Sequence, residues 1–365
     1  VMPLAKGLGS GVPIGAVVAG PKAANIFAPG NHGTTFGGNP LSMRAGIETL
    51  RIMEEDGLMA NAAAGATVVH SHTWYANAAG RVAQLLPGIP HVVTAHSLEP
   101  LRPWKAEQLG GGYRVSSWIE SEAFTTADAV IAVSDGMRND ILRSYPTIDP
   151  DRVTVIYNGI DLEAWRPVTD AAVLAEHGID PARPSVVFVG RITRQKGLPY
   201  LLRAVATLDP AIQIILCAGA ADTPEILAEV EAGVAALRAE RDGVVWIERH
   251  LPRHDLSAIL TAATVFVCPS VYEPLGIVNL EAMACETAVV GSATGGIPEV
   301  VEDGITGRLV PIDQVQDGTG TPVDVDRFVA DLAAALNDAV SDLGRAERMG
   351  VAGRARAVES FSWAS

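Results

Sequence analysis

The sequence predicts an α/β protein of two domains, each built on a parallel sheet. Its 365 residues exceed what one hydrophobic core usually organises, so two domains are expected. From Gly65 onward, short apolar runs alternate with segments of helical spacing, which is typical of parallel strands joined by crossover helices. The clearest pair is the apolar run 265–268 and the segment 277–285, whose apolar residues fall on one helical face.

The same pattern places the remaining elements of both domains. In the first domain we expect strands at 68–70, 91–94, 129–133 and 153–157, with helices at 77–86, 117–126 and 135–145. The segment 158–184 is interpreted as the connection between the domains. In the second domain we expect strands at 186–189, 212–217, 244–247, 265–268, 288–290 and 308–310, and final helices at 325–336 and 344–359.

Composition limits the classes of partner. A net charge of −15 argues against general binding to nucleic acid or to an anionic membrane, so a phosphorylated ligand requires a local basic cluster. No apolar run has the length of a membrane span, and the start of the chain does not resemble a secretory signal. The three cysteines lie in apolar runs without a CxxC motif, so free thiols and a cytoplasmic location are expected.

A basic loop follows the strand at 186–189. It runs from Gly190 to Gly197 and carries Arg191, a planar fork of donors, and Lys196, a mobile point charge. The two glycines allow a tight turn and a close backbone approach. Such a loop suits a phosphate or diphosphate, but arginine and lysine in loops are also commonly only solvated.

Two glutamates and a glycine turn follow the next strands. Glu273 lies in the loop after the strand at 265–268, and Glu281 lies in the helix after that loop. Gly295 and Gly296 lie in a third loop that follows a strand and opens a helix. Ligands of open α/β sheets bind at this end of the strands, so these residues could hold one sugar-like ligand. Taken singly, each glutamate is more readily interpreted as an ordinary surface residue.

Three histidines follow strands of the first domain. His70 is expected to be a buried, hydrogen-bonded core residue, and His96 is expected to line the binding cleft. His70 and His72 alternate along their strand, and no cysteine or acidic cluster accompanies them. A metal site is therefore not expected.

From about Ala60 onward, the chain resembles the retaining GT-B glycosyltransferases of the glycogen synthase type. It looks most similar to the actinobacterial form that uses a nucleotide-diphosphate glucose. The resemblance rests on the following stretches: 70–74 (HSHTW), 94–100 (TAHSLEP), 105–113 (KAEQLGGGY), 158–161 (NGID), the loop 190–197 and the run 273–281. It implies two Rossmann-like domains that face each other across a cleft.

The resemblance also implies roles for individual residues. Arg191 and Lys196 would hold the donor diphosphate, Glu273 would lie by the donor sugar, Glu281 would bind the ribose, and His96 would contact the sugar near its reacting carbon. The other expected donor-binding residues are Gly190, Leu275, Gly276, Gly295 and Gly296.

Residues 1–62 instead resemble a fragment of the acetylornithine/ornithine aminotransferases. Lys6 matches the Schiff-base lysine of that family, and Thr35 matches its phosphate-binding hydroxyl. The aspartate that supports the ring nitrogen has no counterpart here, so a pyridoxal phosphate cofactor is not expected. We therefore expect three segments: 1–62, which is foreign; 63–165, an incomplete acceptor-side domain; and 166–365, the nucleotide-sugar domain.

The expected activity is glucosyl transfer with retention from a nucleotide-diphosphate glucose, with ADP-glucose favoured. The acceptor would be an α-1,4-glucan or glucose 1-phosphate, in glycogen or maltose 1-phosphate synthesis. No cofactor or metal is expected to be required, because Arg191, Lys196 and backbone amides would stabilise the leaving diphosphate. The alternatives are a nucleotide-sugar binder that does not turn over and, less favoured, a pyridoxal phosphate protein.

Overall fold

The computed structural model describes residues 2–5, 15–18, 44, 47, 48, 51, 55, 65–85, 88–106 and 110–363. The chain divides into two compact units, Val1–Val68 and Val69–Ser365. In the first unit, strand β1 (Met2–Ala5) pairs antiparallel with β2 (Gly15–Val18). Lys6 and Thr35 lie outside the described residues, as does most of the segment to which they belong.

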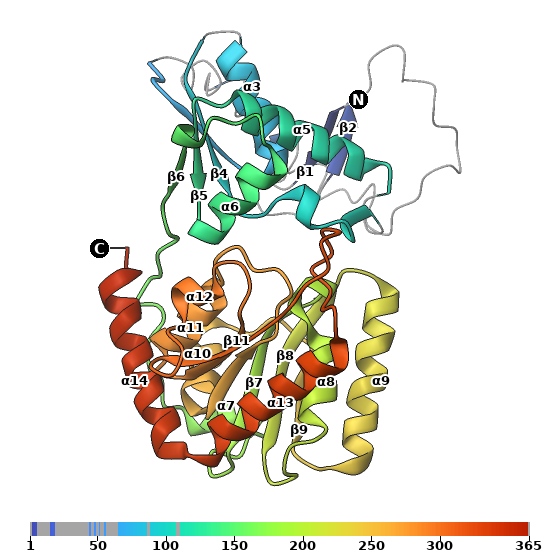
Figure 1. Cartoon of the computed structure of the whole chain (residues 1–365), viewed down its shortest axis with the longest axis vertical. Coiled ribbons are helices and arrows are strands. Elements are labelled where there is room, and N and C mark those ends of the chain that lie inside the picture. Colours follow the sequence, from blue (N-terminus) through green and yellow to red (C-terminus); the bar gives the residue numbers. More distant parts are fainter. Residues whose placement is uncertain are drawn as a thin grey trace. The chain divides into compact units, whose positions relative to one another are not determined.

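A four-stranded parallel sheet opens the second unit (Figure 1). Its strands lie in chain order and are β3 (Val69–His72), β4 (His91–Ala95), β5 (Ala129–Ala132) and β6 (Val153–Val155). Helices α3 (Trp74–Leu85) and α5 (Gly112–Thr126) pack against each other beside it. Helix α6 (Asp135–Ser144) follows β5, and Ser134 caps its first turn by accepting a hydrogen bond from the Met137 amide.

A six-stranded parallel sheet follows, with strand order β12-β11-β10-β7-β8-β9. Its strands are β7 (Ser185–Ile192), β8 (Gln213–Ala221), β9 (Val244–Ile247), β10 (Val265–Cys268), β11 (Ala288–Ser292) and β12 (Gly307–Val310). The chain enters at β7, builds outward through β8 and β9, and then returns to add β10 beside β7. The order therefore reverses between β7 and β10, which is where open α/β sheets bind ligands.

Both faces of this sheet are buried, because successive strand residues alternate between two apolar cores. Val187 and Phe266 belong to one core, while Val186 and Val265 belong to the other. Residues of α8 (Leu198–Val205), α9 (Pro224–Glu240) and α13 (Val325–Ser341) fill the second core. The first core takes residues of α7 (Ala171–Glu176), α10 (Arg253–Ala262), α11 (Ile277–Ala284), α12 (Ile297–Val300) and α14 (Leu343–Ser360). Strands covered on both faces read as continuous apolar runs, which explains why the sequence located them.

The connection between the sheets is held by the end of the chain. The Ile160 amide donates to the Phe361 carbonyl over 2.7 Å, and the Tyr157 ring meets the Phe361 ring edge-on. Phe361 directly follows α14, so this helix returns the chain to the start of the connection expected at 158–184. Within the described residues, no helix combines the length and the apolar character that crossing a bilayer requires.

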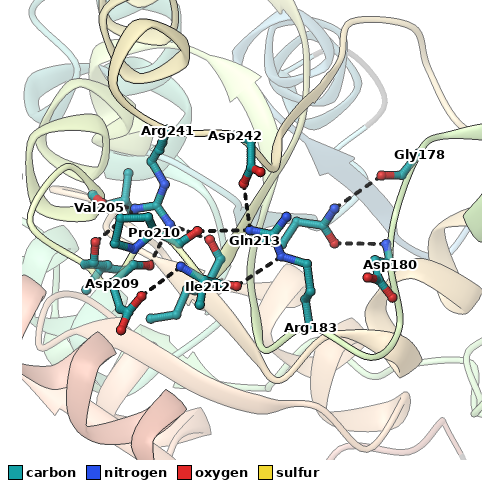
Figure 2. A network of polar contacts seen from close by, with 12 residues as sticks. Gly178, Asp180, Arg183, Val205, Asp209, Pro210, Ile212, Gln213, Arg241 and Asp242 are labelled. Carbon is teal, nitrogen blue, oxygen red and sulfur yellow. Dashed lines mark hydrogen bonds and ion pairs between the residues drawn. The ribbon is translucent and has the colours of Figure 1, made fainter.

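Arg241 organises the turn between α8 and β8 (Figure 2). Its guanidinium is buried and donates to the carbonyls of Val205, Leu208, Asp209 and Ile212. Burial lowers the pKa of Arg241, and the positive charge of Arg183 lowers it further. Backbone amides within the turn reach only some of its carbonyls, such as those of Val205 and Asp209, and Arg183 donates to the carbonyls of Pro210 and Ala211. Arg241 and Arg183 together supply the further donors that this turn needs.

Replacing Arg241 with methionine is expected to destabilise the fold by about 3 kcal/mol, because four carbonyls of the turn each lose a charged donor. Urea unfolding followed by circular dichroism measures the change. Arg238→Met is the matched control, since Arg238 is exposed and makes one 3.3 Å bond to the Val244 carbonyl. Equal midpoints for the two variants would contradict this account of the turn.

Candidate functional site

Lys196 is positioned by a short turn after β7. The 3-10 helix Arg194–Lys196 is capped by Thr193, whose hydroxyl accepts from the Lys196 amide. Gly197 then adopts φ +66°, and a Cβ at this position would overlap the carbonyl oxygen of Pro269 after β10. Gly197 therefore lets the two loops at the strand-order reversal approach each other, which differs from the ligand contact expected of it.

An ion pair joins these two loops. Lys196 Nζ lies 2.5 Å from Glu273 Oε2, and the Ser270 hydroxyl donates to the same oxygen over 3.1 Å. Glu273 is only 7% exposed. Burial alone lowers the pKa of Lys196, but Glu273, together with Cys268 and Glu281, more than offsets this effect, so the pKa is raised. The lysine is consequently a fixed positive charge that can attract a phosphate.

Arg191 and Gly190 lie at the end of β7. The Arg191 guanidinium is exposed and pairs with Asp222, just past β8. It can reach a diphosphate only by sharing or leaving that carboxylate, a partner that the sequence analysis missed. A Cβ on Gly190 would lie 3.2 Å from the Phe188 ring and 3.8 Å from Lys196 Cγ, so glycine leaves room beside the lysine.

Glu281 lies in α11, the helix after the loop that follows β10. Lys196 lies in the loop that follows the neighbouring strand, β7. Gly276, at φ +93°, caps this helix in a left-handed conformation, so the chain turns sharply from the Glu273 loop into α11. Burial raises the pKa of Glu281 to about 7, and the positive charges of Arg253 and Lys196 oppose that rise. Leu275 is only 2% exposed, so its side chain packs in the core and only its backbone could meet a ligand.

The Gly295-Gly296 turn packs directly on the Glu273 loop. Gly295 adopts φ +54°, and a Cβ there would overlap the Glu273 carbonyl oxygen. The Gly296 amide donates to that carbonyl over 2.9 Å. A Cβ on Gly296 would lie 2.6 Å from both Leu275 Cα and the Pro274 oxygen. These glycines therefore support the loop that carries Glu273.

The three histidines gather at the ends of β3 and β4. His72 Nδ1 lies 2.9 Å from His96 Nε2, and His70 Nε2 lies 2.6 Å from Thr94 Oγ1. Burial lowers the pKa of His96, as do His72 and His70, so the ring is neutral near pH 7. Over the described part of the chain, no group of three or more histidine, cysteine or acidic residues is arranged to hold a metal.

The expectation of a buried His70 is wrong. His70 is exposed, and the core position of this strand is Ser71, whose hydroxyl lies 2.6 Å from Nε2 of the fully buried His91. The alternation of a strand sends neighbouring residues to opposite faces, and the short apolar run did not show which face was covered.

Tyr272 was also missed: its hydroxyl accepts from the Leu98 amide over 3.2 Å, joining the first sheet to the Glu273 loop.

Two family models match the chain. The model described as "Glycosyl transferases group 1" matches residues 183–339, and "Glycosyltransferase Family 4" matches residues 26–164. An alpha-maltose-1-phosphate synthase from Mycolicibacterium smegmatis is 58% identical over 326 residues, which is 88% of this chain and 82% of that protein. A protein of the same name from Mycobacterium tuberculosis is 59% identical over 88% of this chain and 81% of its own length.

A solved structure shows the same architecture. Sucrose-phosphate synthase from Thermosynechococcus elongatus superimposes with a TM-score of 0.68 at 28% identity, over 87% of this chain and 75% of that one. The expected GT-B fold is thereby confirmed, with two parallel Rossmann-like sheets.

The comparisons give no support to an aminotransferase-like fragment. The family 4 match begins at residue 26, so it takes in most of the segment 1–62 that was expected to be foreign. The likeness of Lys6 and Thr35 to cofactor-binding residues rested on short glycine-rich motifs, which recur in unrelated folds because tight turns require them.

The pKa of Glu281 predicts a pH dependence of stability. The folded chain holds the Glu281 proton up to about pH 7, whereas the ordinary value is 4.5, so stability should fall as the pH rises between these values. Between these pH values the wild type should lose on the order of 2 kcal/mol of unfolding free energy, since partial exposure moderates the effect. Glu281→Gln mimics the protonated form, so this variant should not show that loss. Urea titrations from pH 5 to pH 8 test this, with exposed Glu359→Gln as control. Parallel profiles for wild type and Glu281→Gln would refute the assignment.

Proposed function

Because the chain belongs to the group 1 glycosyltransferases, a family of enzymes, we propose that it transfers glucose from a nucleotide-diphosphate glucose to a sugar phosphate with retention at the anomeric carbon. The observation that carries this proposal is the Lys196–Glu273 pair. It places a cation and a carboxylate 2.5 Å apart, on the two loops at the strand-order reversal. A diphosphate needs the cation, and sugar hydroxyls need the carboxylate.

The donor would lie across the carboxyl ends of β7, β10 and β11. Lys196 and Arg191 bind the diphosphate, Glu273 accepts hydrogen bonds from the sugar hydroxyls, and Glu281 accepts them from the ribose. The partly buried Glu281 carboxyl suits this role, because hydroxyl donors would compensate the burial that now raises its pKa. The Gly295-Gly296 turn lies beside Glu273 and supports the donor site, because the Gly296 amide donates to the Glu273 carbonyl.

Transfer breaks the bond between the anomeric carbon and the diphosphate. The carbon develops oxocarbenium character while negative charge collects on the departing phosphate. Lys196 and Arg191 stabilise that charge, which is where electrostatic stabilisation contributes most. The acceptor hydroxyl attacks the same face of the sugar and gives its proton to the departing phosphate oxygen, so retention needs no covalent enzyme intermediate. His96, neutral near pH 7, would contact the sugar without adding positive charge near the reacting carbon.

Glucose 1-phosphate is the acceptor we favour over an α-1,4-glucan. Two relatives at 58% and 59% identity are named for the synthesis of maltose 1-phosphate. That product contains two glucose units and one phosphate, so adding one glucosyl unit to glucose 1-phosphate accounts for every atom. ADP-glucose is the favoured donor, with UDP-glucose as the alternative.

Incubation with ADP-glucose or UDP-glucose and each acceptor separates these possibilities. The expected product is α-maltose 1-phosphate, identified by mass spectrometry and phosphorus NMR. Label that enters only polymeric glucan would exclude the sugar phosphate as acceptor. Binding of ADP-glucose in calorimetry without any product would instead indicate a nucleotide-sugar binder that does not turn over.

Glu273→Gln and Lys196→Met should separate the sugar contact from the diphosphate contact. We expect both variants to lower transfer by about 100-fold or more, since each acts where charge develops or the sugar is held. Calorimetry with ADP, which has no sugar, should show weaker binding for Lys196→Met and little change for Glu273→Gln.

Arg203→Met is the control for these two variants. Like Arg191, Arg203 is an exposed arginine paired with an aspartate, here Asp326, and it lies on α8 away from the strand ends. Near-normal transfer by Glu273→Gln or Lys196→Met would overturn the site assignment.

A further inference from the structure

The first turn of α6 is bound by a carboxylate from the other sheet. The amides of Asp135 and Gly136 donate to the two carboxylate oxygens of Glu299, each over 2.8 Å. The Tyr157 hydroxyl donates to Glu299 Oε2 over 2.9 Å. Glu299 lies on α12, directly after the Gly295-Gly296 turn, whereas α6 follows a strand of the four-stranded sheet.

This contact supplies hydrogen-bond acceptors for the first amides of α6. The first amides of any helix have no partner within the helix, and the helix dipole makes that end positive. The Ser134 hydroxyl accepts from the Met137 amide, so the amides of Asp135 and Gly136 require another acceptor. The Glu299 carboxylate provides two oxygens for two amides, and such charge-assisted bonds are stronger than neutral ones.

The backbone at Glu299 is itself held in place by the last helix, α14. Arg356 on α14 donates to the carbonyls of Glu299 and Val300 over 2.8 and 2.9 Å. The short helix α12 therefore presents the carboxylate from a backbone that is already fixed by the last helix. A pre-positioned carboxylate loses little entropy when it meets α6.

The same turn of α6 also touches the loop that carries Glu273. The Ser134 hydroxyl donates to the Pro274 carbonyl over 2.5 Å. A Cβ on Gly136 would lie 2.7 Å from the Gly295 carbonyl oxygen, so the two backbones are in direct contact. Since Gly296 is hydrogen-bonded to Glu273, the first turn of α6 rests on both loops of the candidate donor site.

We propose that Glu299 is a positioning residue for transfer. Its carboxylate holds α6 of the first sheet against the loops of the second. In that arrangement the acceptor-side sheet meets the donor site, and the first turn of α6 supports the Glu273 loop. Glu299 touches neither donor nor acceptor. Glu299 acts on transfer through the placement of the two sheets. This inference rests on the glucosyl transfer proposed above.

The test uses Glu299→Ala, Glu299→Gln and Gly136→Ala in the full chain. Gly136→Ala disturbs the same contact from the α6 side. We expect Glu299→Ala and Gly136→Ala to lower kcat by about 10- to 100-fold, the range expected for losing hydrogen bonds to a charged group. Glu299→Gln keeps one acceptor oxygen and should fall between wild type and Glu299→Ala. The affinity for ADP should change little, because the second sheet holds the diphosphate by itself.

Glu302→Ala is the matched control. Glu302 lies three residues after Glu299 and is exposed, and its carboxylate lies 3.6 Å from the Arg356 guanidinium. It should retain wild-type kcat. Melting curves for all variants show whether each is folded, and a loss of kcat in proportion to the loss of folded protein would contradict a positioning role.

A second measurement does not depend on activity. Spin labels on α3 and α9 report the distance between the two sheets, and Glu299→Ala should broaden and lengthen that distribution. Unchanged distances together with unchanged kcat would overturn the proposal. If the wild type transfers no glucose, the proposed function fails, but the distances still decide whether Glu299 holds the sheets.

Discussion

The backbone of Gly295 and Gly296 lies directly against the backbone of Glu273, and the candidate donor site depends on this contact. Any side chain at Gly295 would overlap the Glu273 carbonyl, and its φ of +54° disfavours other residues as well. The loops after β10 and β11 are consequently joined as one surface. Gly197 does the same for the loops after β7 and β10, and together these contacts bring Lys196 and Glu273 within 2.5 Å.

An ion pair this deeply placed adds little to stability. Removing both charges from water costs energy that their attraction barely repays, so apolar residues would serve the fold as well. A binding role gives a reason for the pair, because a diphosphate and sugar hydroxyls can each take one partner. The fold tolerates the pair because Ser270 gives Glu273 a further hydrogen bond and nearby loops exclude water.

Much of the fold could be predicted because parallel strands covered on both faces are continuous apolar runs. The ten strands that the structure describes in the second unit lie where the sequence placed them, with ends that differ by a few residues. Strand order could not be read in this way. The return of the chain to place β10 beside β7 is decided by packing between segments far apart in sequence, and it makes Lys196 and Glu273 neighbours.

By itself, the sequence determined the alternation of strands and helices, the family resemblance and the residues at the strand ends. The tertiary structure alone decided which of them meet. It showed that Gly197 and Gly295 serve loop packing, that Arg191 is paired with Asp222, that Leu275 is buried, and that Glu299 caps a helix of the other sheet. The physical reason is that periodicity reports which face of an element is apolar. Hydrogen bonds between loops depend on backbone positions that only the assembled sheets define.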